Sequence, residues 1–173
     1  STLTEIDGHG TIYALFNQAS VGKITAKGSE VYIGTKALGE GMAAYNASLA
    51  KDLGVNDDGA LWRIGVEKAP GGYVVDRYDT AADTWERISG GAVKIDVDPQ
   101  GLPWVANDQG AIWHWSGNSW QAAIGKARDI AVGSDGVVWI ISSEGTYTGR
   151  PCFLRSWDAQ NGKTEWHCAS DLP

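Results

Sequence analysis

One ten-residue pattern occurs three times in this 173-residue chain and constrains its fold more than any other feature. Each copy has an aliphatic residue, a valine two positions later, a glycine six positions later and a tryptophan nine positions later. The copies are Leu53–Trp62, Ile95–Trp104 and Ile130–Trp139. Alternate residues of a strand share a face, and glycine supplies the positive φ that a tight turn needs, so each copy predicts a β-hairpin.

Two further strand candidates follow each hairpin, which gives about four strands per unit. They are Tyr73–Tyr78 and Thr84–Ile88, then Ala111–Trp115 and Ser119–Ile124, then Cys152–Trp157 and Thr164–Cys168. A sheet of this size cannot bury both of its faces alone, so the units must stack against one another. The sequence therefore predicts an all-β fold, a small β-propeller of four-stranded antiparallel blades.

Residues 1–50 carry the pattern in a degenerate form, whereas residues 52–168 carry it clearly. Ile6–Tyr13 and Ile24–Tyr32 look like compressed copies with tyrosine near the tryptophan position. We expect a single propeller domain over residues 1–173.

The two ends of the chain suggest how the ring closes. The last strand candidate includes Trp166 and resembles Trp85–Ile88, which elsewhere precedes an inner strand. Pairing it with the segment around Ile6 would close the ring with strands from both termini. Five blades are favoured on this basis, with four and six as alternatives.

The resemblance of the repeats to a known family indicates a function. The run from Trp85 to Trp139 is similar to the tectonin β-propeller repeat family. The most specific feature is the segment just before a hairpin, here called the lead-in, with Trp120, a glycine five positions later at Gly125 and an alanine at Ala127. Tectonin-like proteins are mostly lectins that recognise bacterial lipopolysaccharide or other surface glycans, and they commonly have six blades. The resemblance implies a carbohydrate-binding protein.

Charge and hydropathy exclude two classes of partner. The net charge is −7 and the 14 basic residues are scattered, whereas nucleic-acid binding needs clustered Lys and Arg. No apolar run approaches the roughly 18 to 20 residues of a membrane span. We therefore expect neither nucleic-acid binding nor membrane insertion.

No catalytic motif stands out, and the sequence predicts a protein that is not an enzyme. The three histidines are His9, His114 and His167, without metal-ligand spacing, and no nucleophile elbow or phosphate loop is present. Most carboxylates occupy turns, where Asp and Asn bond their own backbone. The oxygen-rich turn Asn56–Gly59 is the one candidate for a Ca²⁺ site.

Three weaker features favour secretion. Cys152 and Cys168 are the two cysteines, and they either form a disulfide or remain as two buried thiols. Asn46 begins an N-glycosylation sequon. The chain starts at Ser1 rather than Met, as a processed protein would.

The candidate ligand-binding residues are aromatic side chains and nearby polar groups. Trp62, Trp104 and Trp139 recur at one position and are expected to pack between blades. Trp113 and Trp115 share a strand face, on which Trp113 either packs in the core or contacts ligand. The full set of candidates is Trp113, Trp115, Trp157, Asn107, Asp108, Tyr73, Glu144 and Tyr147.

Two longer excursions, Val66–Gly72 and Ser142–Pro151, are expected to be loops and to bring the last three candidates to the surface. An aromatic plane accepts the C–H face of a sugar, and a few amides or carboxylates suffice for its hydroxyls. The predicted function is a lectin-like propeller that binds glycans or lipopolysaccharide. The alternative is a non-catalytic protein-interaction or structural propeller within an assembly.

Overall fold

The computed structural model describes residues 4–9, 11–16, 20–24, 30–32, 49–142, 154–158 and 163–167. Side chains are described for residues 5–9, 11–13 and 49–141. These residues form strands and turns, and no helix long and apolar enough to cross a bilayer occurs among them.

The described chain contains fifteen strands. In order they are β1 (Thr4–Ile6), β2 (Ile12–Phe16), β3 (Ser20–Ile24), β4 (Glu30–Tyr32), β5 (Asp52–Val55), β6 (Leu61–Ala69), β7 (Gly72–Asp79), β8 (Thr84–Ala92), β9 (Lys94–Val97), β10 (Pro103–Ala106), β11 (Ala111–Trp115), β12 (Trp120–Val132), β13 (Val137–Ser142), β14 (Leu154–Asp158) and β15 (Lys163–His167).

The strands form four antiparallel blades that follow one another along the chain. Blade 1 is β1–β4 and blade 2 is β5–β8. A seven-stranded sheet contains the other two, because β12 pairs with β11 up to Lys126 and with β13 from Ala127 onward. Blade 3 is thus β9–β11 with the first half of β12, and blade 4 is the second half of β12 with β13–β15.

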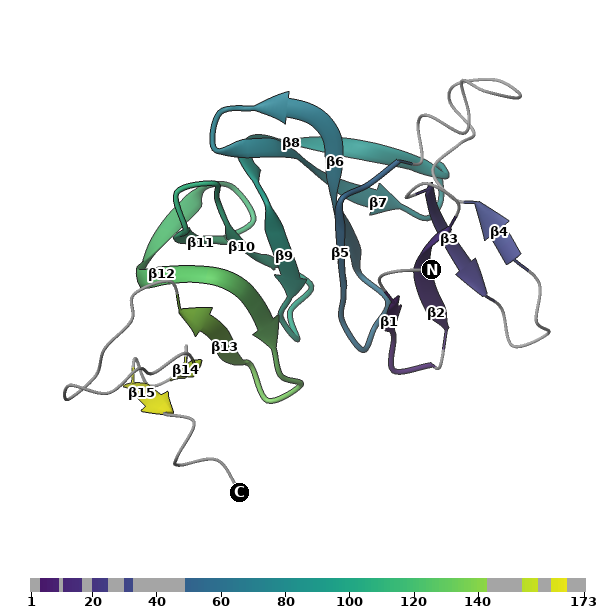
Figure 1. Cartoon of the computed structure of the whole chain (residues 1–173). Helices are drawn as coiled ribbons and strands as arrows, with labels where there is room; N and C mark the ends of the chain where they lie inside the picture. The colour runs from purple at the N-terminus through teal and green to yellow at the C-terminus, as the bar shows by residue number, and fades with distance from the viewer. Residues whose placement is uncertain are drawn as a thin grey trace.

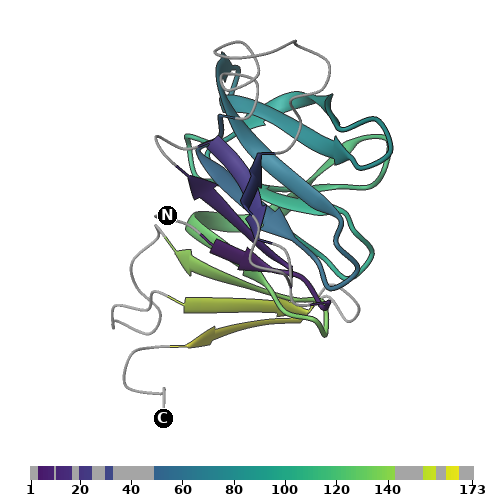
Figure 2. The same ribbon diagram turned by 90° about the vertical axis from the view of Figure 1, so that its right-hand side faces the viewer.

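The blades stand side by side around an arc, with blade 1 at one end and blade 4 at the other (Figure 1). Figure 2 shows the same arc turned by 90°. The first strand of each blade is innermost, and β1 contacts β5, β5 contacts β9, and β9 contacts β12. This stacking of four-stranded sheets is the arrangement that the repeats predict.

The described residues form four blades, one of the numbers that the sequence leaves open, rather than the favoured five. Closure by both termini is not observed among the described strands, where β1 pairs with β2 and β15 pairs with β14. The residues around Ile6 form β1, the inner strand of a complete four-stranded blade, so they begin a blade of their own rather than complete the last one.

The predicted hairpin turns are confirmed in detail. In blade 2 the Gly59 N–H donates to the Asn56 carbonyl at 3.0 Å, and the side-chain oxygen of Asn56 accepts from the Ala60 N–H at 2.8 Å. Gly59 has a φ of 85°, which a residue with a Cβ seldom adopts. Asp98 makes the same side-chain bond to the Leu102 N–H in blade 3, at 2.9 Å.

The degenerate copy near the N-terminus uses the same turn. The carboxylate of Asp7 accepts from the Thr11 N–H at 2.8 Å, and Tyr13 follows Asp7 by six positions, as Trp62 follows Asn56. Tyr13 is buried in one cluster with residues of blade 2. Tyrosine therefore replaces tryptophan as the residue of blade 1 that packs on the following blade.

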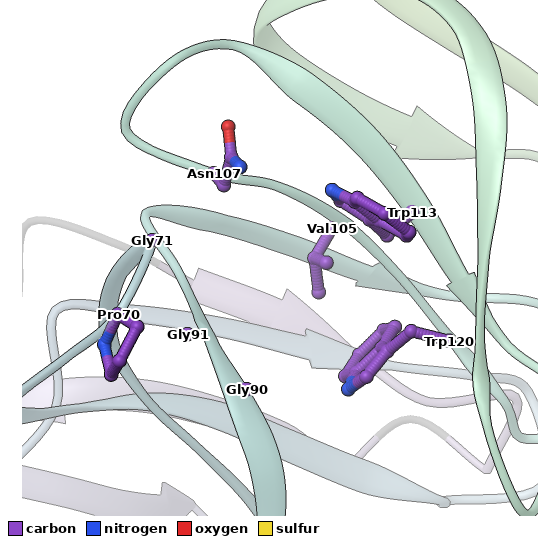
Figure 3. Close-up of a pocket in the computed structure, with 8 residues that line it drawn as sticks. All are labelled: Pro70, Gly71, Gly90, Gly91, Val105, Asn107, Trp113 and Trp120. Carbon is purple, nitrogen blue, oxygen red and sulfur yellow. The ribbon is translucent and has the colours of Figure 1, made fainter.

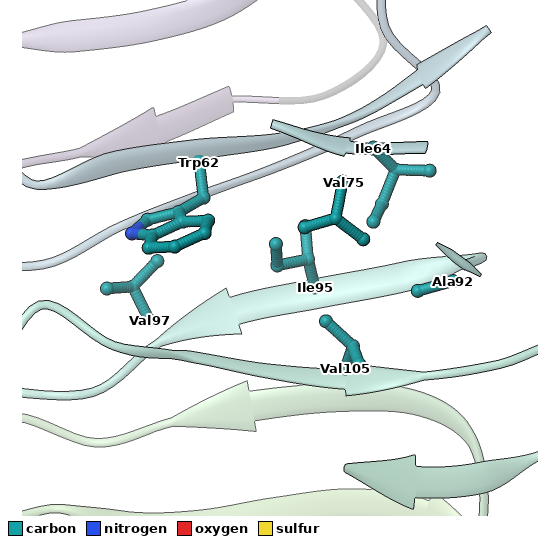
Figure 4. Close-up of a cluster of buried hydrophobic side chains, with 7 residues drawn as sticks. All are labelled: Trp62, Ile64, Val75, Ala92, Ile95, Val97 and Val105. Atoms are coloured by element: carbon teal, nitrogen blue, oxygen red, sulfur yellow. The ribbon is translucent and has the colours of Figure 1, made fainter. Parts of the chain in front are cut away.

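Tryptophan packing between blades forms the core, as Figure 4 shows for blades 2 and 3. Trp62 is 1% exposed and lies in one cluster with Ile95 and Val97, on the inner strand of the following blade. Its indole nitrogen donates to the Gly101 carbonyl at 3.0 Å, so the ring is tied to the next turn as well as buried. Trp104 occupies the equivalent place between blades 3 and 4.

One predicted loop is a strand hairpin instead. The segment Val66–Gly72 continues β6 and begins β7, and only Pro70 and Gly71 turn between the two strands. Proline fixes φ at the first position of such a turn, and Gly71 has a φ of 89° at the second, so two residues suffice to reverse the chain. The other excursion lies outside the described residues from position 143 onward.

We expect Trp62→Ala to lower the free energy of unfolding by about 3–5 kcal/mol, because it removes a buried indole and leaves a cavity between blades 2 and 3. Urea unfolding followed by circular dichroism measures the change. Ile124→Ala is the control, since Ile124 is 83% exposed and its loss should change stability by less than about 0.5 kcal/mol. Equal effects of the two substitutions would contradict the role given to the blade contact.

Candidate functional site

A pocket of about 300 Å³ lies between blades 2 and 3 (Figure 3). Blade 2 contributes the hairpin between β6 and β7 and the end of β8, and blade 3 contributes β10, β11, the turn between them and the start of β12. The lining residues are Pro70, Gly71, Gly90, Gly91, Val105, Asn107, Trp113 and Trp120. The volume lies at the lower end of the range for small-molecule sites, which suits one compact ligand unit.

The wall from blade 2 is made of glycines because two backbone segments meet there. A Cβ on Gly71 would lie 2.8 Å from the Gly91 carbonyl oxygen, and a Cβ on Gly91 would lie 2.5 Å from the Pro70 carbonyl oxygen. Side chains are therefore excluded from these positions of the wall. The Asp108 N–H donates to the Gly71 carbonyl at 2.9 Å, which ties the hairpin of blade 2 to the turn of blade 3.

The opposite wall is made by two indole rings of blade 3. Trp113 lies on β11 and Trp120 begins β12, and both are partly buried. The Trp120 nitrogen donates to the Ser89 carbonyl of blade 2 at 2.5 Å, which holds that ring in place. A Cβ on Gly90 would lie 2.9 Å from the same nitrogen, so glycine is required beside the ring.

The polar groups at the pocket are hydrogen-bond donors. The side-chain oxygen of Asn107 already accepts from the N–H groups of Gln109 and Ala111, at 3.0 and 2.8 Å. Among the described residues, neither the Asn107 amide nitrogen nor the Trp113 indole nitrogen has an acceptor. Figure 3 shows that indole nitrogen on the side of the ring nearer Asn107. A ligand rich in oxygen acceptors would satisfy both donors.

The structure brings two of the predicted site residues, Trp113 and Asn107, into this pocket. Trp115 lies beside it, with its ring centroid 5.1 Å from that of Trp120 in an edge-on contact. Asp108 is exposed on the turn. Tyr73 lies elsewhere on blade 2, with the Lys51 and Lys68 ammonium groups 4.4 and 4.0 Å from its ring centroid.

The remaining predicted residues lie where the structure gives no side chains. Trp157 falls on β14, whose side chains are not among those described. Glu144, Tyr147, Cys152, Cys168 and Asn46 lie outside the described residues. The disulfide, the glycosylation and the binding roles of these residues stay predictions.

Trp120 and the glycines opposite it are not among the site residues predicted from the sequence. A signal is present, because Trp85 and Trp120 are each followed five positions later by a glycine and two further on by a buried alanine. Both glycines have positive φ, 106° at Gly90 and 101° at Gly125. The lead-in therefore marks the bend at which the outer strand of one blade continues toward the next blade.

Carboxylates on the inner strands form a second candidate cluster. Asp52 of β5 accepts the Ile95 N–H of β9 at 3.0 Å, and Asp96 of β9 accepts the Val132 N–H of β12 at 2.6 Å. Each bond joins the inner strands of two successive blades. Burial raises the pKa of both carboxyls to about 6.

Glu5 of β1 belongs to the same cluster. Burial, followed by the negative charges of Asp96, Asp52 and Asp129, raises its pKa to about 7. Lys94 supplies a cation, and its ammonium lies 3.7 Å from a carboxylate oxygen of Asp129.

These groups do not assemble a metal centre. Among the residues that the structure describes, no three His, Cys, Asp or Glu side chains lie close enough to hold a metal ion. In the turn Asn56–Gly59, the Asn56 oxygen is used by the Ala60 N–H, and its amide nitrogen donates to the Pro99 carbonyl at 3.3 Å. The sequence predicts no cofactor and offers this turn only as a candidate for Ca²⁺, and both statements stay predictions.

Other polar and charged side chains form contacts within single blades. The buried Asp76 carboxylate of blade 2 accepts from Arg63 at 3.0 Å and from Arg87 at 2.6 Å. His114 of blade 3 stacks on Trp104, with centroids 4.4 Å apart, and bonds Asp98 at 2.9 Å. These contacts join strands and turns, and none of these residues lines the pocket.

No known protein-family profile matches the sequence, and no curated protein matches it. Solved structures do match. A gluconolactonase from Xanthomonas campestris has a TM-score of 0.61 at 14% identity, and the match covers 95% of this chain and 60% of the gluconolactonase chain. An auxiliary nutrient binding protein from Bacteroides ovatus has a TM-score of 0.62 at 15% identity, and the match covers 98% of this chain and 42% of that protein's chain. A hydrazine synthase from Kuenenia stuttgartiensis has a TM-score of 0.60 at 18% identity, and the match covers 95% of this chain and 48% of the synthase chain.

The fold is that of a β-propeller. The chain spans 42–60% of the length of these three proteins, so its four blades correspond to part of each of them. At such low identity the likeness extends to the fold and no further, and none of the three is described as a tectonin.

The comparison corrects one prediction from the sequence. The absence of catalytic motifs predicts a protein that is not an enzyme, yet the fold is shared with a gluconolactonase over 95% of this chain. The prediction is therefore withdrawn, because an enzyme shares this fold and the absence of motifs typical of other folds excludes no activity. Binding proteins share the fold as well.

The inner-strand carboxylates predict a pH dependence of stability. Their folded-state pKa values, about 6 for Asp52 and Asp96 and about 7 for Glu5, lie above the ordinary 3.8 and 4.5. At pH values between the ordinary pKa and the raised pKa of each carboxyl, the folded state binds more protons than the unfolded state. The free energy of unfolding should therefore rise as the pH falls from about 8 to about 5.5. Urea unfolding at a series of pH values measures this trend.

Asp52→Asn is the matched variant, because the amide oxygen still accepts the Ile95 N–H but no longer titrates. We expect a shallower pH dependence in this variant. A wild-type stability that increases with pH over the same range would contradict the prediction.

Proposed function

We propose that this β-propeller binds a glycan, such as a sugar unit of lipopolysaccharide or of another surface polysaccharide, in the pocket between blades 2 and 3. The observation that carries the proposal is the pairing of Trp113 and Trp120 on one wall with two nitrogen donors at the pocket, on Asn107 and Trp113. Aromatic planes suit the apolar face of a sugar ring, and amide and indole N–H groups suit its hydroxyl oxygens.

The resemblance of the lead-in repeats to tectonins supports the same ligand class. The lead-in includes Trp120, which lines the pocket, so the feature that resembles the family also builds the site. A propeller scaffold is rigid and holds loops and turns in fixed positions, as binding requires. The fold is shared with an auxiliary nutrient binding protein, which is consistent with a ligand-binding role.

The proposal includes an extracellular location. It rests on the cysteine pair, Cys152 and Cys168, and on the sequon at Asn46. The second candidate function is a propeller that binds another protein. The exposed turn that carries Asp108 and Gln109 beside the pocket would then form part of the contact.

A glycan array, followed by titration with the best ligand and with lipopolysaccharide, tests the proposal. We expect Trp113→Ala to weaken glycan binding at least about tenfold, which corresponds to about 1.4 kcal/mol, because the sugar loses its aromatic platform. Trp113→Phe keeps an aromatic plane and should retain most of the affinity. Tryptophan fluorescence or calorimetry measures the dissociation constants.

Trp85→Ala is the matched control. Trp85 occupies the position in blade 2 that Trp120 occupies in blade 3, but it packs in the cluster between blades 1 and 2, away from the pocket. Its loss should leave glycan affinity unchanged at temperatures where the variant is folded. No detectable binding on the array or to lipopolysaccharide, together with a copurifying protein partner, would reject the glycan proposal and favour the second candidate.

A further inference from the structure

A basic cluster lies beside the pocket, on the hairpin that builds one of its walls. It consists of Lys51, Lys68 and Tyr73, and the two ammonium groups lie over the Tyr73 ring, at 4.4 and 4.0 Å from its centroid. Lys68 and Tyr73 pair across β6 and β7, two positions on either side of the Pro70–Gly71 turn that lines the pocket. Two residues of a strand span about 7 Å, so the cluster is within reach of a ligand in the pocket.

The strands of blade 2 hold the cluster in place. The Lys51 N–H donates to the Ile64 carbonyl at 2.7 Å, which fixes the residue just before β5 against β6. The Tyr73 ring is partly buried and packs against the hydrophobic cluster between blades 2 and 3, as the Trp113 ring does. The Tyr73 ring therefore lies at the same blade junction as the pocket, while Lys51 and Lys68 are both exposed.

Among the residues that the structure describes, neither lysine of the cluster pairs with a carboxylate. Glu67 is next to Lys68 in sequence, but its carboxylate pairs with Arg87 at 3.3 Å. Asp52 is next to Lys51, but it bonds the inner strand of blade 3. Two positive charges thus stand over one ring in a chain whose net charge is −7. One cation suffices for a cation–π contact, whereas the second adds a repulsion that a bound anion would relieve.

The cluster stabilises negative charge on oxygen. A hydrogen bond from Lys68, aided by the positive charges of Lys51 and Lys68, lowers the pKa of the Tyr73 phenol below its ordinary value of 10. The pocket has a matching polarity, because the Asn107 amide nitrogen and the Trp113 indole nitrogen are donors without an acceptor among the described residues. These N–H and ammonium groups together suit a ligand that carries both neutral and charged oxygen acceptors.

We propose that Lys51, Lys68 and Tyr73 form an anion subsite of the glycan pocket, which takes a sulfate, phosphate or carboxylate substituent of the bound saccharide. This inference rests on the proposed function, since the glycan presents the charged group. The sugar ring would pack on Trp113, and its substituent would reach past the Pro70–Gly71 turn to the lysines. The three substituents share an oxyanion that can accept from both ammonium groups and from the Tyr73 hydroxyl.

An anion without a glycan tests the subsite directly. NMR titration of the intact chain with inorganic phosphate, at an ionic strength held constant with chloride, should give saturable shifts of the Lys51 and Lys68 side-chain signals and of the Tyr73 ring. Two charge-assisted hydrogen bonds correspond to a dissociation constant on the order of 1 mM. We expect Lys51→Gln and Lys68→Gln each to weaken phosphate binding about tenfold.

Arg77→Gln is the matched control. It removes one positive charge from the strand that carries Tyr73, but the Arg77 side chain is 54% exposed and pairs with Glu86. Phosphate affinity should stay unchanged in this variant, and the amide NMR spectrum of each variant confirms that the blades remain folded. Shifts that do not saturate by about 20 mM phosphate, or an equal weakening by Arg77→Gln, would overturn the subsite.

Paired glycans separate this inference from the proposed function. Sulfated, phosphorylated and uronate forms of one oligosaccharide are compared with the unmodified parent, on the array and by calorimetry. We expect at least one charged form to bind about tenfold more tightly than the parent, and this preference to disappear in the double variant Lys51→Gln/Lys68→Gln. Equal affinities for the parent and all charged forms would overturn the inference and leave the proposed function standing. Saturable phosphate binding without binding of any glycan would reject the proposed function and retain the anion site.

Discussion

The structure depends on one contact, in which an aromatic residue of each blade packs against the inner strand of the following blade. Trp62 illustrates it: the ring is buried with Ile95 and Val97, and its nitrogen donates to the Gly101 carbonyl of the next turn. A hairpin that supplies this ring cannot bury it within its own sheet. The spacing of glycine and tryptophan in the sequence therefore determines how neighbouring sheets stack, as well as how each hairpin turns.

The same inner strands must approach closely, and carboxylates join them. Gly54 shows how close the approach is, since a Cβ there would lie 2.8 Å from Asp96 Cα of the neighbouring strand. Asp52 and Asp96 accept backbone N–H groups across these contacts, which satisfies donors that a strand edge would otherwise leave unpaired. Burial of the two carboxyls raises their pKa, so the bonds that join the blades also carry an electrostatic cost near neutral pH.

Local features are predictable from the sequence, and long-range ones are not. The hairpin at Leu53–Trp62 and its two copies follow from turn chemistry and alternation, which depend on residues close in the chain. Blade number does not, because it depends on whether the segment around Ile6 begins a blade or completes one. The pocket is half predictable for the same reason: Trp113 and Asn107 are close in sequence, whereas Trp120 and Gly91 join the site only through contact between two blades.

Comparison of two equivalent tryptophans shows how the residues around Trp120 leave room for the pocket. Trp85 and Trp120 occupy the same position of the lead-in, and each faces the preceding blade. Around Trp85 the space is filled, because the Arg63 guanidinium lies 4.2 Å from its ring and the Tyr78 centroid lies at 5.2 Å. Around Trp120 the facing residues are glycines, so a hollow remains. The repeat thus supplies an aromatic wall in both places, and the residues around that wall decide whether it becomes core or binding surface.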